Sequence, residues 1–423
     1  MVAFREWLDR LITISLCAMV FTIPFSKSAV EACFIASLVL WALKKILSYE
    51  PYVSASQLFK QIFSGLNLPV YLFVLIGLIS TCYSVSLPLS LKGFFSKLME
   101  GVLLFFIAAD HIDSRKKINL ILISLSLSIC LISVDGIFQF ITGRDFIRHY
   151  PSWGPRIQAS FSNPNGFGGW LVVMLPLVLS FVFINKDLWS KIAVKIIIWA
   201  SMCILAFCLL MTYSRGAWIG VVLALLFFGI FKKSKLLMIM IPVLIALPLI
   251  LPIPIKTRIM NALPFTISYS IKGRLESIGS LAEPIRGSLW REAMAIVKDF
   301  PAFGCGLNTY SVVAPHYKGS GTKAGIYPHN SYLQMAAETG IVGLASFIML
   351  IMALFITSLM NVIRIRDTFY KNILLGLLSG LFGFLVHSFF DVHFYALQLA
   401  TLMWFVMGLI MAVQNTALKE QSA

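Results

Sequence analysis

The chain has 423 residues, of which 59% are hydrophobic and only 12% are charged, and its formal net charge is +16. Soluble domains are about half apolar and about one quarter charged, so this composition excludes a soluble protein and indicates a polytopic membrane protein. A bilayer-embedded chain with few acidic residues meets anionic lipid and phosphate. Anionic lipid and phosphate are therefore better candidate partners for its positive charge than nucleic acid.

Apolar runs of spanning length recur along the whole chain. A transmembrane helix needs about 20 predominantly apolar residues, so these runs predict an all-α membrane protein with about twelve transmembrane helices. The predicted helices cover residues 8–25, 28–46, 67–86, 94–110, 118–142, 166–184, 193–213, 215–231, 236–253, 340–361, 372–390 and 395–413.

Lys and Arg residues are concentrated in alternate short connections between these runs. Lys45, Lys233 and Arg366 are examples. Basic residues close to membrane spans are retained in the cytoplasm, so we expect these connections and both termini to be cytoplasmic. No small-residue cleavage site follows the first apolar run, which should therefore remain as a signal anchor.

The apolar runs also divide the chain into three expected parts. Residues 1–253 should form the transmembrane bundle of helices 1–9, and residues 254–338 a large periplasmic loop subdomain with short helices. Residues 339–423 should form helices 10–12 and a short cytoplasmic tail.

A short helix is expected inside the large loop. Ser288 can cap it, and it should run to about Asp299 with Leu289, Ala293 and Ile296 on one face. The Phe300-Pro301 pair that follows should end this helix.

A histidine lies where the large loop returns to apolar sequence, in His329-Asn330-Ser331. Asn330 or Ser331 can cap a helix, because a short side-chain oxygen there accepts from amides that have no intrahelical partner. An imidazole at such an edge can exchange a proton near neutral pH. The alternative is a histidine that only caps backbone or binds water. Gly340 and Gly343 would let the following helix pack closely.

Arginines collect in the segments expected on the outer face. Arg215 occupies a tight turn between two apolar runs, and Arg291 follows Trp290 in the large loop. Guanidinium forms bidentate bonds with phosphate oxygens that Lys does not copy, so we favour a functional role for these two. For most of the others we favour snorkelling to lipid head groups. The outer arginines are Arg144, Arg148, Arg156, Arg215, Arg258, Arg274, Arg286 and Arg291.

A few further charged residues lie within or next to apolar runs. A carboxylate at the depth of Asp135 is costly and is usually partnered or functional. Lys92 has no near acidic partner and is a phosphate candidate. Asp391 and His393 form a short acidic and imidazole-bearing link expected on the outer side.

Several common catalytic motifs are missing from the sequence. It contains no outer Asp-x-Asp or Glu-x-Asp pair to hold a divalent metal beside a diphosphate, and no Cys/His cluster with zinc spacing. It also lacks a Walker lysine loop and a Gly-x-Ser-x-Gly elbow. Metal-assisted, nucleotide-driven and serine-hydrolase chemistries are therefore disfavoured.

Four pieces of the sequence resemble the O-antigen ligase family, within a superfamily of lipid-linked glycan ligases and polymerases. His329-Asn330 followed by nine residues and Gly340-x-x-Gly343 matches the family's histidine–glycine signature. The segments 214–218, 290–293 and 156–165 resemble its arginine-bearing segments. One element departs from the pattern: the family often has Leu four positions after an arginine, whereas Ile219 and Ala295 stand there in this chain.

The resemblance implies an inverting, metal-independent glycosyl transfer without a cofactor, on the periplasmic face of a bacterial inner membrane. The donor would be O-antigen polysaccharide on undecaprenyl diphosphate, and the acceptor a sugar of lipid A–core. His329 would act as the general base, and Arg215 and Arg291 would stabilise the diphosphate. We expect six further residues to contact substrate: Lys92, Arg156, Asn165, Arg286, Asn330 and Asp391.

Other functions remain open on the sequence. An O-antigen or exopolysaccharide polymerase would use another lipid-linked glycan as its acceptor. A protein O-oligosaccharyltransferase is also possible, although no large extra C-terminal domain follows the twelfth predicted helix. From a different class, the chain could transport a lipid-linked anion, but transporters more often show related halves and broken helices near the midplane.

Overall fold

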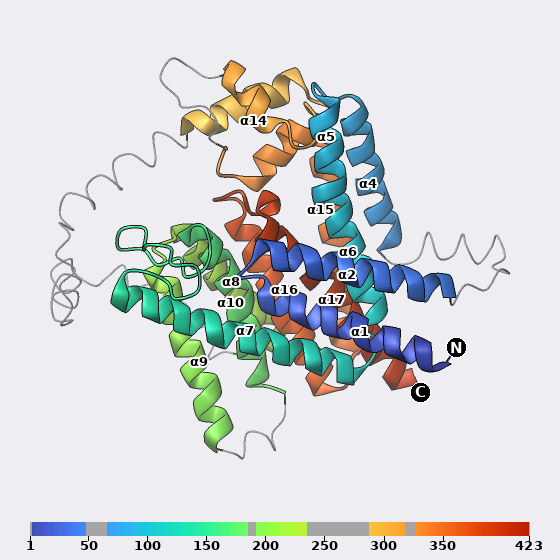
Figure 1. Ribbon diagram of the computed structural model, residues 1–423, viewed down its shortest axis with the longest axis vertical. Coiled ribbons are helices and arrows are strands. Elements are labelled where there is room, and N and C mark those ends of the chain that lie inside the picture. Colours follow the sequence, from blue (N-terminus) through green and yellow to red (C-terminus); the bar gives the residue numbers. More distant parts are fainter. Residues whose placement is uncertain (1, 48–65, 185–191, 235–286, 318–326, 423) are drawn as a thin grey trace. The chain divides into compact units, whose positions relative to one another are not determined.

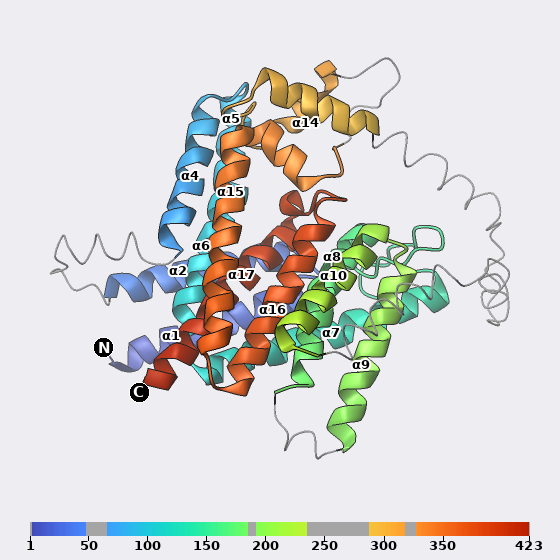
Figure 2. The same ribbon diagram turned by 180° about the vertical axis from the view of Figure 1, so that it is seen from behind.

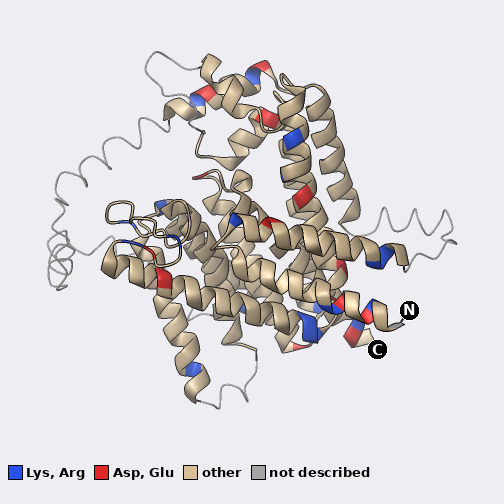
Figure 3. Cartoon of the chain, viewed as in Figure 1, with Lys and Arg blue, Asp and Glu red and all other residues tan. Residues whose placement is uncertain are grey.

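The computed structural model describes residues 2–47, 66–184, 192–234, 287–317 and 327–422. Across these ranges the chain is helical, and its extended pairing is limited to two isolated bridges, Arg144 with Pro151 and Trp153 with Arg156. The predicted all-α class is therefore confirmed. Figure 3 shows that most of the ribbon carries neither acidic nor basic residues, as expected of helices that meet lipid.

Seven helices in the described ranges are long and apolar enough to cross a membrane. They confirm a multi-span membrane protein, while the total of twelve spans stays a prediction. These helices are α7 (Arg115–Thr142), α8 (Pro164–Phe181), α9 (Ile192–Met211), α10 (Arg215–Lys232), α15 (Ser331–Arg364), α16 (Thr368–His387) and α17 (Leu397–Ser422).

The first four predicted spans are also helical. They correspond to α1 (Val2–Thr22), α2 (Lys27–Leu47) and α4 (Asn67–Cys82), and to a continuous stretch of α5 (Leu87–Gly93), a π-helix η1 (Phe94–Met99) and α6 (Glu100–His111). The fourth helical stretch is longer than the 94–110 that the sequence predicts. The ninth predicted span, 236–253, lies outside the described residues.

Contacts divide the chain into two compact units. The first unit comprises Met1–Cys130, Ile285–Leu374 and Ser388–Ala423, and the second comprises Leu131–Pro284 and Leu375–His387. These units do not follow the expected boundaries at 253 and 338, and that three-part division stays a prediction. The proposed base His329 belongs to the first unit and Arg215 to the second.

In the first unit, long helices pack in pairs: α1 with α2, α4 with α15, and α6 with α17. Figures 1 and 2 show α4 and α15 running side by side. Small residues allow these close approaches. A Cβ on Gly408 of α17 would lie only 2.7 Å from the Phe105 carbonyl oxygen of α6, so glycine is required there.

Helix α15 starts at Ser331, nine residues before the apolar run predicted at 340–361, and is kinked at Gly340. Gly340 has φ of 71° and ψ of 179°, a conformation that glycine tolerates, and a Cβ there would overlap the Ala302 carbonyl. The kink frees helix carbonyls for other partners: Ala337 accepts from the amide of Cys305 at 2.9 Å. The predicted helix cap at Asn330 is confirmed, and the apolar run predicted to span from residue 340 is the continuation of this helix beyond the kink.

The second unit is built around α8, which is buried along nearly its whole length. It packs against α9 and α10. The part of α16 in this unit approaches α10 at two glycines, since a Cβ on Gly220 would lie 2.7 Å from the Gly383 carbonyl oxygen. Close glycine contacts of this kind hold α10, and with it Arg215, in a rigid bundle.

Candidate functional site

The short helix predicted in the large loop is present and supports the site from one side. Residues 287–299 are helical, and Leu289, Ala293 and Ile296 on its inner face are fully buried. Ser288 lies within the helix and not before it, so the predicted cap position was wrong. The inner face packs in a small apolar core with side chains that include Cys305, Tyr310 and Ala337.

Asn330 positions the residues around His329 by capping α15. Its side-chain oxygen accepts hydrogen bonds from the amides of Tyr332 and Leu333, each at 3.0 Å. These amides would otherwise have no partner, because the first turn of a helix leaves its N–H groups unsatisfied. Asn330 is 1% exposed, so the buried cap is a structural contact, and substrate binding by Asn330 stays a prediction.

His329 and Asp391 form a hydrogen-bonded pair at this helix start. His329 Nδ1 lies 3.0 Å from Asp391 Oδ1. Since a carboxylate only accepts, Nδ1 carries the proton, and in the neutral ring Nε2 then holds a lone pair. The His329 side chain is 40% exposed, whereas that of Asp391 is 13% exposed. An accessible imidazole is thus oriented by a more buried carboxylate.

Ser331 ties the His329 turn to the segment that carries Asp391. Its amide donates to the carbonyls of Ser388 and Asp391, and its hydroxyl donates to the Asp391 carbonyl at 2.8 Å. The same hydroxyl accepts from the amide of His393 at 2.9 Å. The two segments that supply the pair are therefore joined by main-chain bonds as well as by the side chains.

The electrostatics of this cluster keep Asp391 ionised. Burial alone would raise its pKa, but the hydrogen bond from His329, the neighbouring imidazoles and the Val392 amide hold the pKa of Asp391 well below its ordinary value. His393 is 2% exposed, and burial lowers its pKa to about 4 against the opposing effect of Asp391. At neutral pH the cluster thus pairs an ionised carboxylate with a neutral buried His393.

The other residues predicted for this unit lie at separate places. Arg291 is exposed on the helix at 287–299, directly after Trp290, whose indole N–H donates to the Pro328 carbonyl at 2.9 Å. Lys92 is exposed near the end of α5. Arg286 lies outside the described residues. Roles for these cations in substrate binding stay predictions.

Arg215 is the first residue of α10 in the second unit. The preceding Tyr213 has φ of 49°, in the left-handed region that few residues other than glycine adopt. Ser214 stands at the cap position without a side-chain cap bond, and its hydroxyl instead lies 3.3 Å from His387 Nε2. Arg215 itself is exposed. The turn therefore presents its guanidinium from a constrained main chain.

Arg156 and Asn165, both predicted to contact substrate, are brought together in this second unit. Arg156 Nη2 donates to Asn165 Oδ1 at 2.7 Å, and Nε donates to the Thr212 carbonyl at 2.7 Å. These bonds brace the chain just before Tyr213 and Arg215. The sequence pattern thus correctly grouped these two residues with the Arg215 turn, which they support in the structure. Their contact with substrate stays a prediction.

Asp135 is partnered, as its depth in an apolar helix predicts. It accepts from the Phe146 amide at 2.9 Å and from the Ser160 hydroxyl at 2.7 Å. One turn later on α7, Gln139 accepts from the amides of Gln158 and Ala159. These two side chains anchor the polar segment between α7 and α8, so their role in this structure is to hold a loop.

Sequence reasoning missed a buried carboxylate next to the kink in α15. Glu338 is 1% exposed and accepts from the amide of Asn308 at 2.9 Å and from Gln334 Nε2 at 3.1 Å. Lys97, on the π-helix η1, donates to Asn308 Oδ1 at 2.7 Å. Lys97 and Asn308 also line a pocket of about 50 Å³ with Trp404. The signal that could have found Glu338 is an acidic residue just before a Gly-x-x-Gly pair in apolar sequence.

A comparison with protein families gives the functional context of these turns. Residues 200–348 match the model of the O-antigen ligase family, a segment that contains Arg215, Arg291, His329 and Asn330 but not Asp391. No curated protein matches the chain. The family implies glycan transfer of the O-antigen ligase or polymerase type, on lipid-linked glycan substrates. The matched segment, with the histidine and arginine turns that it contains, supports a relation to the O-antigen ligase family, and the long apolar helices make the chain a multi-pass membrane protein.

Proposed function

We propose that the protein is an O-antigen ligase. It transfers O-antigen polysaccharide from undecaprenyl diphosphate to a sugar hydroxyl of lipid A–core, at the periplasmic face of a bacterial inner membrane. The observation that carries this proposal is the His329–Asp391 hydrogen bond, because it gives an accessible imidazole the tautomer and orientation of a general base. The family match and the multi-span fold support the same reaction class.

The reaction is a single displacement at the anomeric carbon of the donor. His329 Nε2 takes the proton of the acceptor hydroxyl. At the same time the oxygen of that hydroxyl bonds to the anomeric carbon, from the face opposite the diphosphate. The bond from that carbon to the diphosphate oxygen breaks, and undecaprenyl diphosphate leaves with the electron pair. Asp391 compensates the positive charge that forms on the imidazole, much as the carboxylate does in a catalytic triad.

Arginines stabilise the leaving diphosphate. Negative charge grows on its oxygens as the glycosidic bond breaks, and a fixed guanidinium near that charge lowers the barrier. Arg291 is exposed on a helix whose inner face is fully buried, so its main chain is held firmly. Arg215, in the second unit, enters the proposal through the family match and through the constrained turn that presents it.

The direct test is a reconstituted transfer. The purified protein is mixed with an undecaprenyl diphosphate-linked polysaccharide and lipid A–core, with and without excess chelator. We expect the glycan to become attached to lipid A–core at the same rate in both samples, because the sequence offers no outer acidic pair to hold a metal. Activity that returns only with magnesium or manganese would contradict the metal-independent reaction.

A second experiment separates ligase from polymerase. In a strain that lacks the protein, a ligase defect removes all long-chain lipopolysaccharide bands and lets lipid-linked glycan accumulate. A polymerase defect instead leaves a band with one repeat unit. The first pattern is the expected result, and a single-repeat band would assign the protein to the polymerase side of its superfamily.

A further inference from the structure

The main chain of His329 adopts a conformation that its surroundings must hold. Its φ is 48°, in the left-handed region, where a side chain costs free energy. Such a residue keeps this conformation only where neighbouring contacts fix it. On its C-terminal side, the Asn330 cap and the Ser331 hydrogen bonds do so. The peptide on the N-terminal side of His329 needs a contact of its own to hold it.

Trp290 supplies that contact. Its indole Nε1 donates to the carbonyl of Pro328 at 2.9 Å, and this carbonyl belongs to the peptide that precedes His329. Proline has no N–H, so the carbonyl is the hydrogen-bonding group by which Pro328 can be held. Pro328 is buried, which makes a partner for its carbonyl necessary.

The same indole also contacts the segment that carries Asp391. The rings of Trp290 and Phe389 meet edge to face, with centroids 5.5 Å apart and an interplanar angle of 81°. This geometry is favourable for aromatic pairs. Phe389 lies two residues before Asp391. One side chain thus touches both of the segments that meet in the His329–Asp391 pair.

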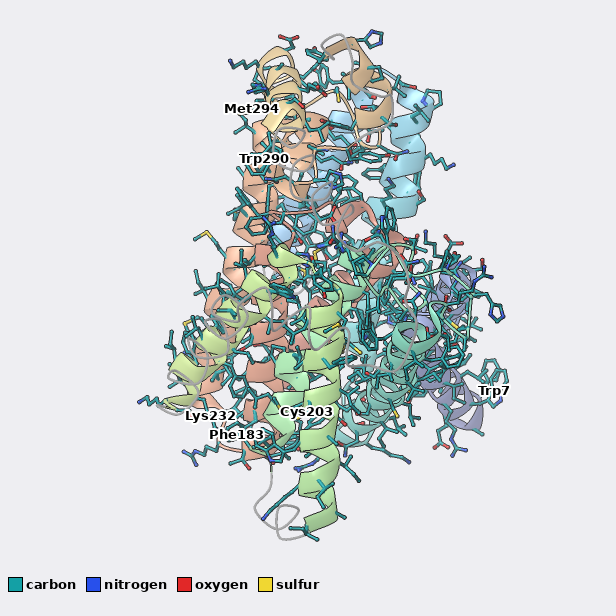
Figure 4. All side chains as sticks on the ribbon, turned by 90° about the vertical axis from the view of Figure 1, so that its left-hand side faces the viewer. Trp7, Phe183, Cys203, Lys232, Trp290 and Met294 are labelled. Carbon is teal, nitrogen blue, oxygen red and sulfur yellow. The ribbon has the colours of Figure 1, made fainter. Side chains whose placement is uncertain are left out.

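The helix that carries Trp290 is a firm support. Trp290 and Met294 lie one helical turn apart, as labelled in Figure 4. On the inner face, Ala293 and Ile296 pack with Ala337 of α15, the helix that starts beside His329. A hydrogen bond from such a helix restricts the His329 turn more than a bond from a free loop could.

Resting on the function proposed above, we propose that Trp290 is a positioning residue for the general base. Its indole N–H holds the Pro328 carbonyl, and its ring holds Phe389, so that His329 and Asp391 stay aligned for proton transfer. Because Arg291 is the next residue, one short helix carries both a support of the base and an arginine of the proposed donor site.

The test uses the full-length protein and the reconstituted transfer. Trp290→Phe keeps an aromatic ring and removes the N–H, and 3-benzothienylalanine at position 290 keeps the bicyclic shape while sulfur replaces the N–H. We expect both to lower kcat about tenfold, as loss of a hydrogen bond at an active site typically does, and to leave KM for the donor within about twofold. The second variant decides the outcome if Trp290→Phe does not fold.

Trp41→Phe is the matched control. It removes an indole N–H bond to Asp110 Oδ2 of 2.8 Å on another part of the first unit, and its transfer rate should equal that of the wild type. The changes at 290 are also made in His329→Gln, where they should cause no further loss, because no base remains to be aligned.

Three results would overturn the positioning role: wild-type kcat in both variants, a loss confined to donor KM, or the same tenfold loss in the His329→Gln background. The wild-type rate in the same preparations reports the proposed function separately. A wild-type protein that attaches no glycan to lipid A–core would contradict that function, whereas an active wild type with equally active variants would contradict the inference alone.

Discussion

Two turns of this molecule share one design and differ in how it is used. In the first unit, left-handed His329 is followed by Asn330 at the cap and by the start of α15. In the second unit, left-handed Tyr213 is followed by Ser214 at the cap and by Arg215, the first residue of α10. In both, a constrained residue and a short polar residue bring the proposed functional side chain to a helix start.

The difference lies in the partners of the polar residues. Asn330 uses its side-chain oxygen on two amides of its own helix, while Ser214 makes no such cap bond and faces His387 at 3.3 Å. His329 pairs with an ionised carboxylate, which suits its proposed role as the general base. Arg215 is exposed on its turn, which suits its proposed role in binding the diphosphate. Similar turns thus carry the proposed base in one unit and a proposed diphosphate-binding cation in the other.

The largest effect should come from removing the base. His329→Gln can keep a hydrogen bond but cannot take the proton, so we expect turnover to fall by a factor of about one hundred to ten thousand. Donor binding, measured separately with the undecaprenyl diphosphate-linked glycan, should be unchanged. Transfer close to the wild-type rate would make His329 a residue that only holds the substrate.

The next largest effect should come from the arginines. Arg215→Lys and Arg291→Lys keep the charge but lose the planar, bidentate geometry. Each should slow transfer about one hundredfold or more, since a contact that strengthens in the transition state contributes about 2–4 kcal/mol. Kinetic assays on well-expressed variants measure the rate of glycan transfer. Full ligation by either variant would reduce that arginine to a residue that snorkels to lipid head groups.

A smaller effect is expected at Asp391. Asp391→Asn removes the ionised partner of His329, and a hydrogen bond to a charged group is worth about 1.5–3 kcal/mol, roughly ten- to one-hundredfold in kcat. The pKa of Asp391 is held below its ordinary value of 3.8. The ionised carboxylate therefore supports His329 at every pH above 3.8, and this support is lost only as the pH falls through the lowered pKa. A neutral-pH assay therefore tests the ionised form. An unchanged kcat would exclude Asp391 from orienting the base.

The smallest effect concerns the caps themselves and compares the two turns directly. Asn330→Ala removes two bonds to helix amides and should lower the free energy of unfolding by about 1 kcal/mol. Ser214→Ala removes only the long contact with His387 and should cost about 0.5 kcal/mol. Thermal melting of the purified variants checks the order. A larger loss of stability for Ser214→Ala than for Asn330→Ala would mean that the Ser214 hydroxyl stabilises the fold more than the Asn330 side chain does.

Much of the fold could be predicted, because lipid imposes a strong pattern on sequence. Long apolar runs identified the helices, and the spacing of Leu289, Ala293 and Ile296 identified the inner face of the loop helix. The apolar run predicted at 340–361 covers only the part of α15 after the kink, because its first turns, from Ser331, are more polar. There, residues 331–339 contain the buried Glu338, whose partner Asn308 lies 30 positions away in the sequence, and sequence periodicity does not show such a contact.

The site was predictable where local chemistry defined it and unpredictable where it depends on contacts far apart in sequence. Asn330 was found as a possible cap because a cap is a local signal. Asp391 was found only as an acidic residue on an expected outer link. Its partnership with His329 joins residues that are 62 positions apart. Trp290 was likewise known only as the neighbour of Arg291, and its bond to Pro328 spans 38 positions.

The configuration of the new glycosidic bond tests the central claim most directly. If His329 removes the acceptor proton while the diphosphate leaves in one displacement, the anomeric centre must invert. The measurement uses a donor of known anomeric configuration and determines the linkage to lipid A–core by NMR of the purified product. We predict the opposite configuration to that of the donor. A retained configuration would require a covalent glycosyl–enzyme intermediate and would contradict the assignment of His329 as the base in a single displacement.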